Sequence, residues 1–224
     1  PLLDWTLAEN RERFSRALDK SRKGFPLKAP LFINGRKVTT KKEISSTNPN
    51  NPQEVIGVVT AAGKAETEKS IKAAKMAFPA WRDTDPGVRA EYLFRAAAAA
   101  RKMRYELAAL QVYEVGKTWS DADADVCEAI DYLEYYGREM ICLAKPQRMG
   151  NIPGEISHLF YDPRGVGAVI APWNFPLAIS MGMTAAAIVT GNTVIYKPSS
   201  QSAVTGSMVY RIFEMCKLPT GVLN

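Results

Sequence analysis

Two short apolar runs, each followed by a longer apolar segment, constrain the fold of this chain more than any other feature. The first run, GVGAVIA at residues 165–171, is rich in β-branched side chains and bounded by glycine and proline, which predicts a strand buried on both faces of a parallel sheet. The second run, TVIYK at residues 193–197, predicts another such strand. Residues 177–190 and 203–216 have the length and composition of helices. The order strand, helix, strand, helix predicts an α/β fold with right-handed crossovers.

Polar side chains follow both predicted strands, at the edge where open parallel sheets bind ligands. Asn174 lies in a turn flanked by Pro172 and Pro176, and Lys197 ends the second strand. A neutral carboxamide on a rigid turn is a good hydrogen-bond donor to a developing oxyanion, whereas an asparagine in a turn commonly bonds its own backbone. Lys197 can contact ribose hydroxyls or phosphate, although a lysine at a strand end is commonly just solvated. The residues alone leave both pairs of alternatives open.

Three motifs at these positions resemble those of the aldehyde dehydrogenase superfamily: APWNFP at residues 171–176, GNTV at 191–194 and KPS at 197–199. The resemblance implies an aldehyde-dehydrogenase-like α/β fold, a Rossmann-type parallel sheet with flanking helices. It also implies NAD as the cofactor and Asn174 as the side-chain half of an oxyanion hole. The residues that it assigns to the NAD site are Ile170, Ala171, Pro172, Trp173, Asn174, Lys197, Ser199 and Ser200. Many members carry glutamate at the position of Ser200, where it holds the adenosine ribose together with the lysine.

The N-terminal region predicts one helix and several short strands. Residues 5–23 favour a helix capped by Asp4, with Leu7, Phe14 and Leu18 on one apolar stripe. It is expected to lie against the body of the protein.

A hairpin is expected next, because Asn34 and Gly35 separate two apolar runs and both central positions of such a turn favour positive φ. A strand at residues 54–59 is expected to complete a small antiparallel element with it. The motifs FING at 32–35 and TNPN at 47–50 are similar to the opening of the same family. The aspartate-aromatic start and the long first helix resemble, more specifically, delta-1-pyrroline-5-carboxylate dehydrogenases, including the dehydrogenase half of bifunctional proline utilization A.

Residues 64–145 are helical in pattern almost without interruption, and the breaks are expected at Pro79 and at residues 85–87. The acidic helix predicted over residues 120–145 carries Asp121, Asp125 and Glu128 near one face. These carboxylates suggest either a metal site or a solvated face. The second is favoured, because hard cations usually take ligands from several segments.

Residues 146–162 predict two strands joined by a loop, and in the resembled family a hairpin here leaves the domain and joins subunits. The chain is therefore expected to divide into three parts. Residues 1–145 are the first part of the NAD-binding domain, residues 146–162 are an oligomerisation hairpin, and residues 163–224 are a Rossmann-like βαβα unit of the same domain. The hairpin implies a homo-oligomer. His158, the only histidine, is expected on the surface of the hairpin.

Composition excludes several function classes. The net charge of +6 is uneven, but the basic residues of the N-terminal part spread around a helix and a turn, so no nucleic-acid surface is expected. No segment is long and apolar enough to span a bilayer, and the N-terminal residues do not have the pattern of a secretory signal peptide. A cytoplasmic location is therefore expected by default. Cys127, Cys142 and Cys216 have no metal-like spacing and are interpreted as structural.

The reaction implied by the resemblance is NAD-dependent oxidation of an aldehyde, most specifically L-glutamate gamma-semialdehyde to glutamate in proline catabolism. That chemistry needs a cysteine nucleophile and a glutamate base, and neither is expected within these residues, so the catalytic domain is expected to be absent and the chain inactive alone. Gly165 and Gly167 come before the predicted strand and not after it, so they cannot form a dinucleotide-binding fingerprint. The expectation that the cofactor is NAD therefore comes from the family resemblance. The alternatives are an aldehyde dehydrogenase with another substrate, or a non-catalytic fragment or assembly module.

Overall fold

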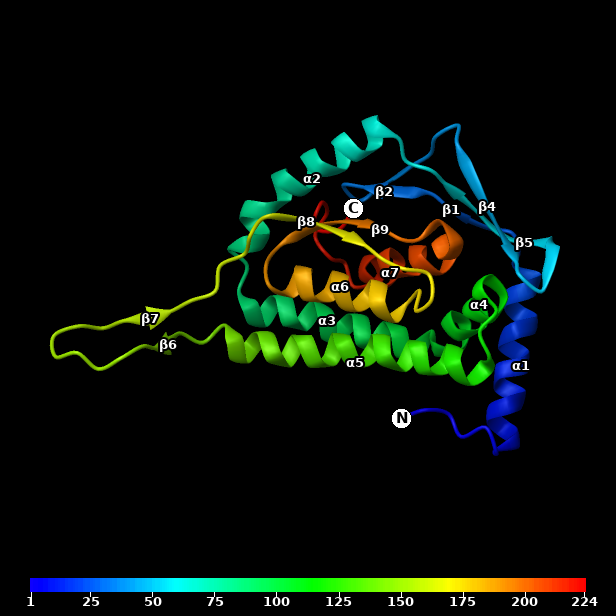
Figure 1. Ribbon diagram of the computed structural model, residues 1–224, viewed down its shortest axis with the longest axis horizontal. Helices are drawn as coiled ribbons and strands as arrows, with labels where there is room; N and C mark the ends of the chain where they lie inside the picture. Colours follow the sequence, from blue (N-terminus) through cyan, green and yellow to red (C-terminus); the bar gives the residue numbers. More distant parts are fainter.

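The computed structural model describes all 224 residues, and a parallel pair of strands lies at its centre (Figure 1). β8 (Val166–Ile170) pairs in parallel with β9 (Thr193–Lys197), in a register that runs from Val166 opposite Thr193 to Ile170 opposite Lys197. The ladder continues on the other side of β9, where the Val194 amide donates to the Val222 carbonyl at 2.7 Å. The predicted parallel pairing is confirmed, but the chain forms four small sheets and no single broad one.

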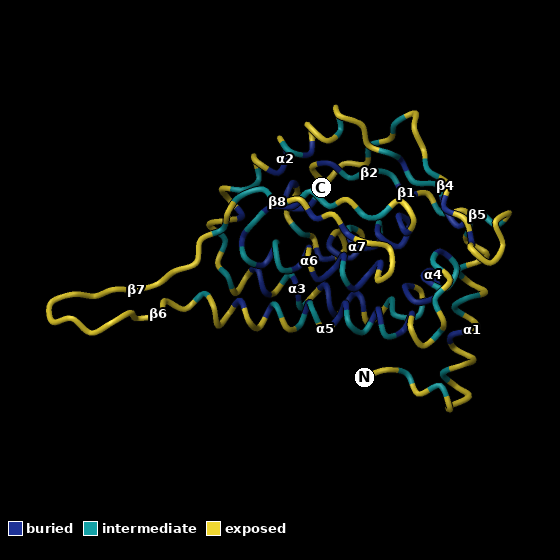
Figure 2. Tube along the Cα trace, in the orientation of Figure 1, coloured by how far each residue is buried: buried dark blue, intermediate teal, exposed yellow.

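Helices cover both faces of this pair. α6 (Ala178–Val189) and α7 (Ala203–Met215) pack on one face, with α3 (Pro86–Lys102) and α5 (Trp119–Leu143) in the layer beyond them (Figure 1). α2 (Lys64–Arg82) lies on the opposite side, where the Thr193 hydroxyl donates to the Ala74 carbonyl at 3.0 Å. The main apolar core fills the space between the helical layers and the strands, as the buried segments of Figure 2 show.

The prediction that the first strand is buried on both faces is wrong. Val169 is buried, whereas Ala168 and Ile170 on the other side of β8 are exposed, Ile170 by 66%. The reason is that no element of the chain covers that side near the end of the strand.

The first helix begins later than predicted. α1 spans Ala8–Lys23, and Asp4 does not cap it, because its carboxylate accepts hydrogen bonds from the amide and hydroxyl of Thr6 at 2.9 and 2.6 Å. Phe14 is fully buried and contacts the ring of Trp119, but Leu7 is 54% exposed because it precedes the helix. The buried apolar stripe of α1 is thus shorter than predicted, because it does not include Leu7.

The hairpin at Asn34 and Gly35 is confirmed, and both residues have positive φ, 51° and 73°. It joins β2 (Leu31–Ile33) to β3 (Arg36–Val38).

The strand predicted at residues 54–59 is part of β5 (Asn51–Thr60), but it does not pair with the hairpin, contrary to the prediction. It pairs instead with β4 (Glu43–Asn48) in antiparallel and with β1 (Leu27–Ala29) in parallel. The physical reason is that β1 and β4 occupy both of its edges.

The break predicted at residues 85–87 is confirmed at the start of α3, the one predicted at Pro79 is wrong, and a break at Met103 was not predicted. Pro79 lies inside α2, which continues to Arg82 because Trp81 is buried and its indole nitrogen donates to the Ile188 carbonyl at 3.0 Å. α3 begins after Asp85, whose carboxylate accepts from the amide of Gly87 at 2.7 Å. α4 (Arg104–Val115) ends at Gly116, which has the left-handed φ of 69° that glycine permits.

Residues 146–162 form an arm that projects from the body (Figure 1). Its strands are β6 (Gln147–Arg148) and β7 (His158–Leu159), and nearly all of its residues are exposed (Figure 2). His158 is among them. No helix of the chain combines the length and apolar character needed to cross a bilayer.

Candidate functional site

The candidate site lies at the carboxyl ends of β8 and β9. The amide of Ala171 donates to the carbonyl of Lys197 at 3.2 Å, so the two strand ends remain side by side. Beyond this bond the chain turns away at Pro172 on one strand and at Pro198 on the other. The sheet therefore brings together the two groups of residues that the motifs singled out.

Asn174 is at the apex of the first turn. Its side chain is exposed and makes no hydrogen bond within the chain, so the alternative that it only bonds its own backbone does not hold. The neighbouring Ile170 and Trp173 are 66% and 50% exposed. A free carboxamide thus stands beside two exposed apolar side chains.

The helix that follows the turn is anchored by a buried carboxylate. Asp125 of α5 is fully buried, and its Oδ1 accepts a hydrogen bond from the Ala178 amide at the start of α6, at 2.8 Å. Its Oδ2 lies 3.1 Å from Nζ of Lys117. Burial raises the pKa of Asp125, while the charge of Lys117 opposes that shift.

The interpretation of Asp125 as part of a solvated face is therefore wrong, because α6 packs over it. Asp121 lies outside this pair and accepts from the Thr118 hydroxyl at 2.7 Å, and Glu128 accepts from the Tyr132 hydroxyl at 2.9 Å. No three side chains of histidine, cysteine, aspartate and glutamate lie close enough together to hold a metal ion.

The second turn carries Lys197, Ser199 and Ser200. Lys197 is exposed and forms no ion pair, and its Nζ donates to the Pro198 carbonyl at 3.2 Å. The Ser199 hydroxyl accepts from the Gln201 amide at 3.3 Å and so caps the short 3-10 helix η1 (Ser200–Ser202). Ser200 is exposed at the first position of that helix.

A hollow of about 400 Å³ opens between these turns and the edge of β4. Trp173 and Ser200 line it on one side, and Glu114 of α4 lines it on the other. The residues of the lining are Ser45, Ser46, Thr47, Pro49, Glu114, Val115, Trp173, Ser200 and Gln201.

Glu114 joins three elements at this hollow. Its carboxylate accepts hydrogen bonds from the Ser46 hydroxyl at 2.8 Å and from the amides of Val204 and Thr205 at 2.9 and 2.6 Å. Burial raises its pKa, against the lowering effect of these hydrogen bonds. This role of Glu114 could not be predicted from the sequence, because a single glutamate near the end of a helix carries no signal that a distant helix begins beside it.

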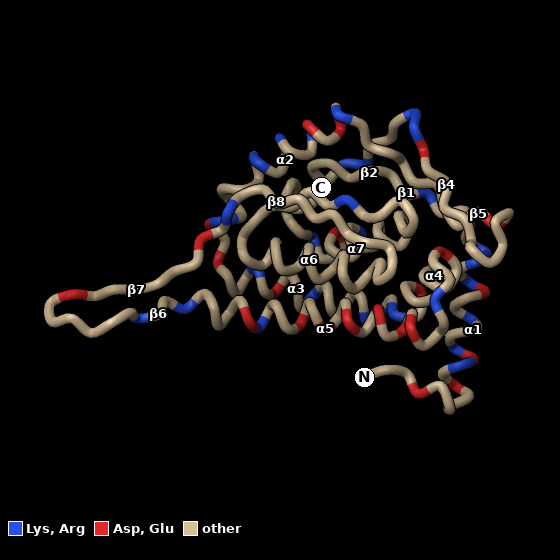
Figure 3. The backbone as a smooth tube through the Cα atoms, viewed as in Figure 1, with Lys and Arg blue, Asp and Glu red and all other residues tan.

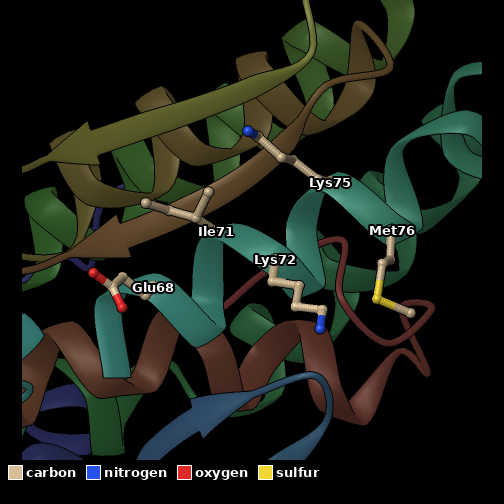
Figure 4. A pocket seen from close by; sticks show the side chains of 5 residues that line it. All are labelled: Glu68, Ile71, Lys72, Lys75 and Met76. Atoms are coloured by element: carbon tan, nitrogen blue, oxygen red, sulfur yellow. The ribbon is translucent and has the colours of Figure 1, made fainter. Parts of the chain in front are cut away.

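A second hollow, of about 350 Å³, lies along α2 and contains none of the predicted site residues. Figure 4 shows that its five lining side chains, Glu68, Ile71, Lys72, Lys75 and Met76, all come from that one helix. Acidic and basic side chains are interspersed along α1, whereas the charged residues of α5 are acidic except for Arg138, so basic charge is not gathered into one stripe on either helix (Figure 3).

Two of the three cysteines lack the surroundings of an activated nucleophile. Cys216 is buried at the C-terminal end of α7, and burial raises the pKa of its thiol. Burial also raises the pKa of Cys127. A nucleophilic cysteine needs the opposite shift. Cys142 is exposed near the C-terminal end of α5.

The fold and these motifs place the chain in a class of enzymes. It belongs to the aldehyde dehydrogenase family, whose sequence pattern matches residues 36–224. Over all 224 residues it is 48% identical to a 1-pyrroline-5-carboxylate dehydrogenase from Geobacillus sp. (strain WCH70) and 46% identical to one from Bacillus pumilus (strain SAFR-032). It is thus homologous to these dehydrogenases over its whole length.

Solved structures show the same relationship. A 1-pyrroline-5-carboxylate dehydrogenase from Thermus, solved with bound NAD, matches the whole chain with a TM-score of 0.97 at 44% identity. Proline utilization A from Bdellovibrio bacteriovorus matches it with a TM-score of 0.99 at 40% identity. The chain spans 44% of the length of each of these dehydrogenases and 23% of the proline utilization A chain.

Proposed function

We propose that the full-length protein oxidises L-glutamate gamma-semialdehyde, the open form of 1-pyrroline-5-carboxylate, to glutamate with NAD as the oxidant. The observation that carries this proposal is the free carboxamide of Asn174 at the carboxyl end of β8, in a chain whose relatives at 46–48% identity are 1-pyrroline-5-carboxylate dehydrogenases. Proline catabolism is the setting that this reaction implies.

Asn174 would act on the aldehyde oxygen. When a nucleophile adds to the carbonyl carbon, that oxygen gains negative charge, and the carboxamide N–H donates a hydrogen bond to it without losing a proton. The donor is effective because it is oriented before the reaction begins. The nucleophile and the base that activates water are expected in the part of the protein that this chain does not contain.

The residues at the strand ends fit a dinucleotide. Ile170 and Trp173 offer exposed apolar surface to a flat ring, and the Lys197 ammonium is free of any ion pair and suits ribose hydroxyls or phosphate. The proposed NAD site comprises Ile170, Ala171, Pro172, Trp173, Asn174, Lys197, Ser199 and Ser200. When bound, NAD supplies the hydride acceptor.

We further propose that the arm at residues 146–162 joins subunits into a homo-oligomer, and that it separates residues 1–145 and 163–224 of one NAD-binding domain. The support is the exposure of large apolar side chains on the arm. They are Met149, Ile152, Ile156, Leu159, Phe160 and Tyr161.

The test is a comparison of aldehydes with the full-length protein, followed through NADH formation. We expect kcat/KM for glutamate semialdehyde to exceed that for a straight-chain aldehyde of similar length by at least about tenfold, because recognition of charged groups discriminates strongly. Preference for the straight-chain aldehyde would indicate another aldehyde dehydrogenase. The absence of NADH with every aldehyde would favour a non-catalytic assembly module.

A further inference from the structure

A buried ion pair holds the turn that carries Asn174. Asp125 bonds the Ala178 amide at 2.8 Å, and its other oxygen lies 3.1 Å from Nζ of Lys117. The same Nζ lies 4.2 Å from the centre of the Phe175 ring, within the range of a cation–π contact. The residue directly after Asn174 and the first residue of α6 are thus both bound by side chains from outside the turn.

Leu177 packs into the apolar core, but no other side-chain hydrogen bond reaches the turn at this end. The residue before α6, Leu177, cannot accept a hydrogen bond with its side chain, so Asp125 supplies from α5 the cap that the local sequence lacks. At the other end, the bond from the Ala171 amide to the Lys197 carbonyl fixes the end of β8. Residues 172–174 form the span between these anchors.

We propose that Asp125 and Lys117 are positioning residues that orient the Asn174 carboxamide toward the aldehyde oxygen, an inference that rests on the proposed function. An oxyanion donor works because its direction is set in advance. A displacement of about 1 Å in such a group costs on the order of a hundredfold in rate. Holding Phe175 and Ala178 limits that displacement.

The structural alternative is that the pair only stabilises the packing of α5 on α6. α5 offers a matched control for this alternative in Asp123, which is 1% exposed and lies two residues from Asp125. Asp123 pairs with Arg104 at 2.6 Å and accepts from the Leu3 amide at 2.9 Å, so its contacts lie on the N-terminal segment and on α4. Replacing either aspartate by alanine removes a buried, paired carboxylate from the same helix.

In the full-length protein, Asp125→Ala is expected to lower kcat/KM for the aldehyde by about 10- to 100-fold while KM for NAD stays within about twofold. Asp123→Ala is expected to lower the Tm but leave kcat/KM near that of the wild type. Asp125→Asn keeps an oxygen for the Ala178 amide and should recover part of the loss. Wild-type kcat/KM in Asp125→Ala would overturn the inference.

A double-mutant cycle separates positioning from stability. In an Asn174→Ala background, Asp125→Ala should cause no further loss of kcat/KM, because there is no carboxamide left to misplace. Losses that multiply would assign Asp125 a purely structural role and overturn the inference. If Asp125→Ala does not fold, the same cycle with Lys117→Met applies, since that change removes the cation from both the carboxylate and the ring.

A readout independent of activity completes the test. Amide hydrogen exchange over residues 172–181 should increase in Asp125→Ala and stay unchanged in Asp123→Ala. Equal exchange in the two variants would contradict the inference. A wild-type protein without aldehyde oxidation would overturn the proposed function and this inference together, whereas an active wild type with a fully active Asp125→Ala would overturn this inference alone.

Discussion

Glu114 and Asp125 are buried carboxylates that bind the first amides of helices next to the candidate site. Asp125 binds α6 at Ala178, and Glu114 binds α7 at Val204 and Thr205. A carboxylate is favourable at such a position, because the helix N-terminus carries unpaired N–H groups and a partial positive charge. At the scale of single residues, the Asp125 and Glu114 side chains fix where α6 and α7 begin relative to β8 and β9.

Replacing Glu114 by glutamine should destabilise the full-length protein by about 1–3 kcal/mol, because one oxygen becomes an NH₂ group that faces hydrogen-bond donors. The destabilisation should depend on pH. Burial raises the pKa of Glu114 above the ordinary value of 4.5, so in the folded state it keeps its proton at pH values where the unfolded chain has lost it. The advantage of the wild type over Glu114→Gln should therefore be largest below pH 4.5 and decrease as pH rises through the folded pKa. Urea unfolding of both proteins over a pH series measures this difference.

Glu54 provides a control of opposite sign. A hydrogen bond from Asn48, together with the hydrogen bond and charge of Arg22, lowers the pKa of Glu54 below 4.5 against the opposing effect of burial. The advantage of the wild type over Glu54→Gln should thus be present above that pH and disappear as pH falls through the folded pKa. The same direction of pH dependence in both variants would contradict the assignment for Glu114.

The chemistry of single residues was only partly predictable from the sequence. The positions of Asn174 and Lys197 at two neighbouring strand ends were predictable, because proline and glycine mark those ends. The role of Asp125 was not, since its spacing from Asp121 and Glu128 places it on a helix face but does not show that α6 covers that face. The sequence gives little indication that Asp125 caps α6. The one related feature is its ion-pair partner Lys117, which directly follows the glycine that ends α4.

At the scale of elements, the second turn of the site depends on close packing by α7. A Cβ added at Gly206 would lie 2.3 Å from Cβ of Pro198 and 3.0 Å from the hydroxyl oxygen of Tyr196. Tyr196 lies in β9, and Pro198 directly follows that strand. Only glycine lets the helix approach the segment between Lys197 and Ser199 this closely.

Gly206→Ala should therefore destabilise the full-length protein by about 1–3 kcal/mol, since the strain of overpacking exceeds the gain of alanine in a helix. Gly167→Ala in β8 is the matched control. Its Cβ would meet nothing closer than the Thr193 carbonyl oxygen at 3.9 Å, so its stability should change by no more than about 0.5 kcal/mol. Thermal unfolding of the two variants makes the comparison, and equal Tm values would contradict the packing argument.

Elements with local signals were predictable, and those defined by distant partners were not. The turn at Asn34 and Gly35 and the strands β8 and β9 are bounded by residues that favour their own conformations. The pairing of β5 with β1 has no local signal, because a parallel pair is made by segments separated in the chain. Pro79 was wrongly taken as a helix end, since the burial of Trp81 two residues later outweighs the lost backbone hydrogen bond.

At the scale of the whole molecule, the arm is the segment with the least support from the rest of the chain. Its two strands pair with each other, and its large apolar side chains are exposed. Such a segment gains stability when a second molecule covers those side chains. The arm was predictable from its prolines, glycines and alternating apolar residues. The surface that would cover it could not be predicted, because that surface belongs to another molecule.

If the arm joins subunits as proposed, replacing residues 146–162 by a short glycine-serine linker should give a species of smaller mass without unfolding the subunit. Light scattering during gel filtration measures the mass, and circular dichroism checks the fold. Ile156→Asp together with Phe160→Asp should have the same effect with the arm still present. An unchanged mass in both variants would show that the arm does not join subunits.

In the proposed function, Asn174 at the end of β8 is the oxyanion donor, whereas Lys197 at the end of β9 provides the charged contact with NAD. The most direct measurement compares Asn174→Ala with Lys197→Met in the full-length protein, through kcat/KM for glutamate semialdehyde and calorimetric titration of NAD. Asn174→Ala should lower kcat/KM by about 100- to 1,000-fold with nearly unchanged NAD affinity. Lys197→Met should weaken NAD binding by about 10- to 100-fold, as expected for the loss of a charged hydrogen bond. Wild-type turnover in Asn174→Ala, or loss of NAD binding in that variant with none in Lys197→Met, would contradict the account.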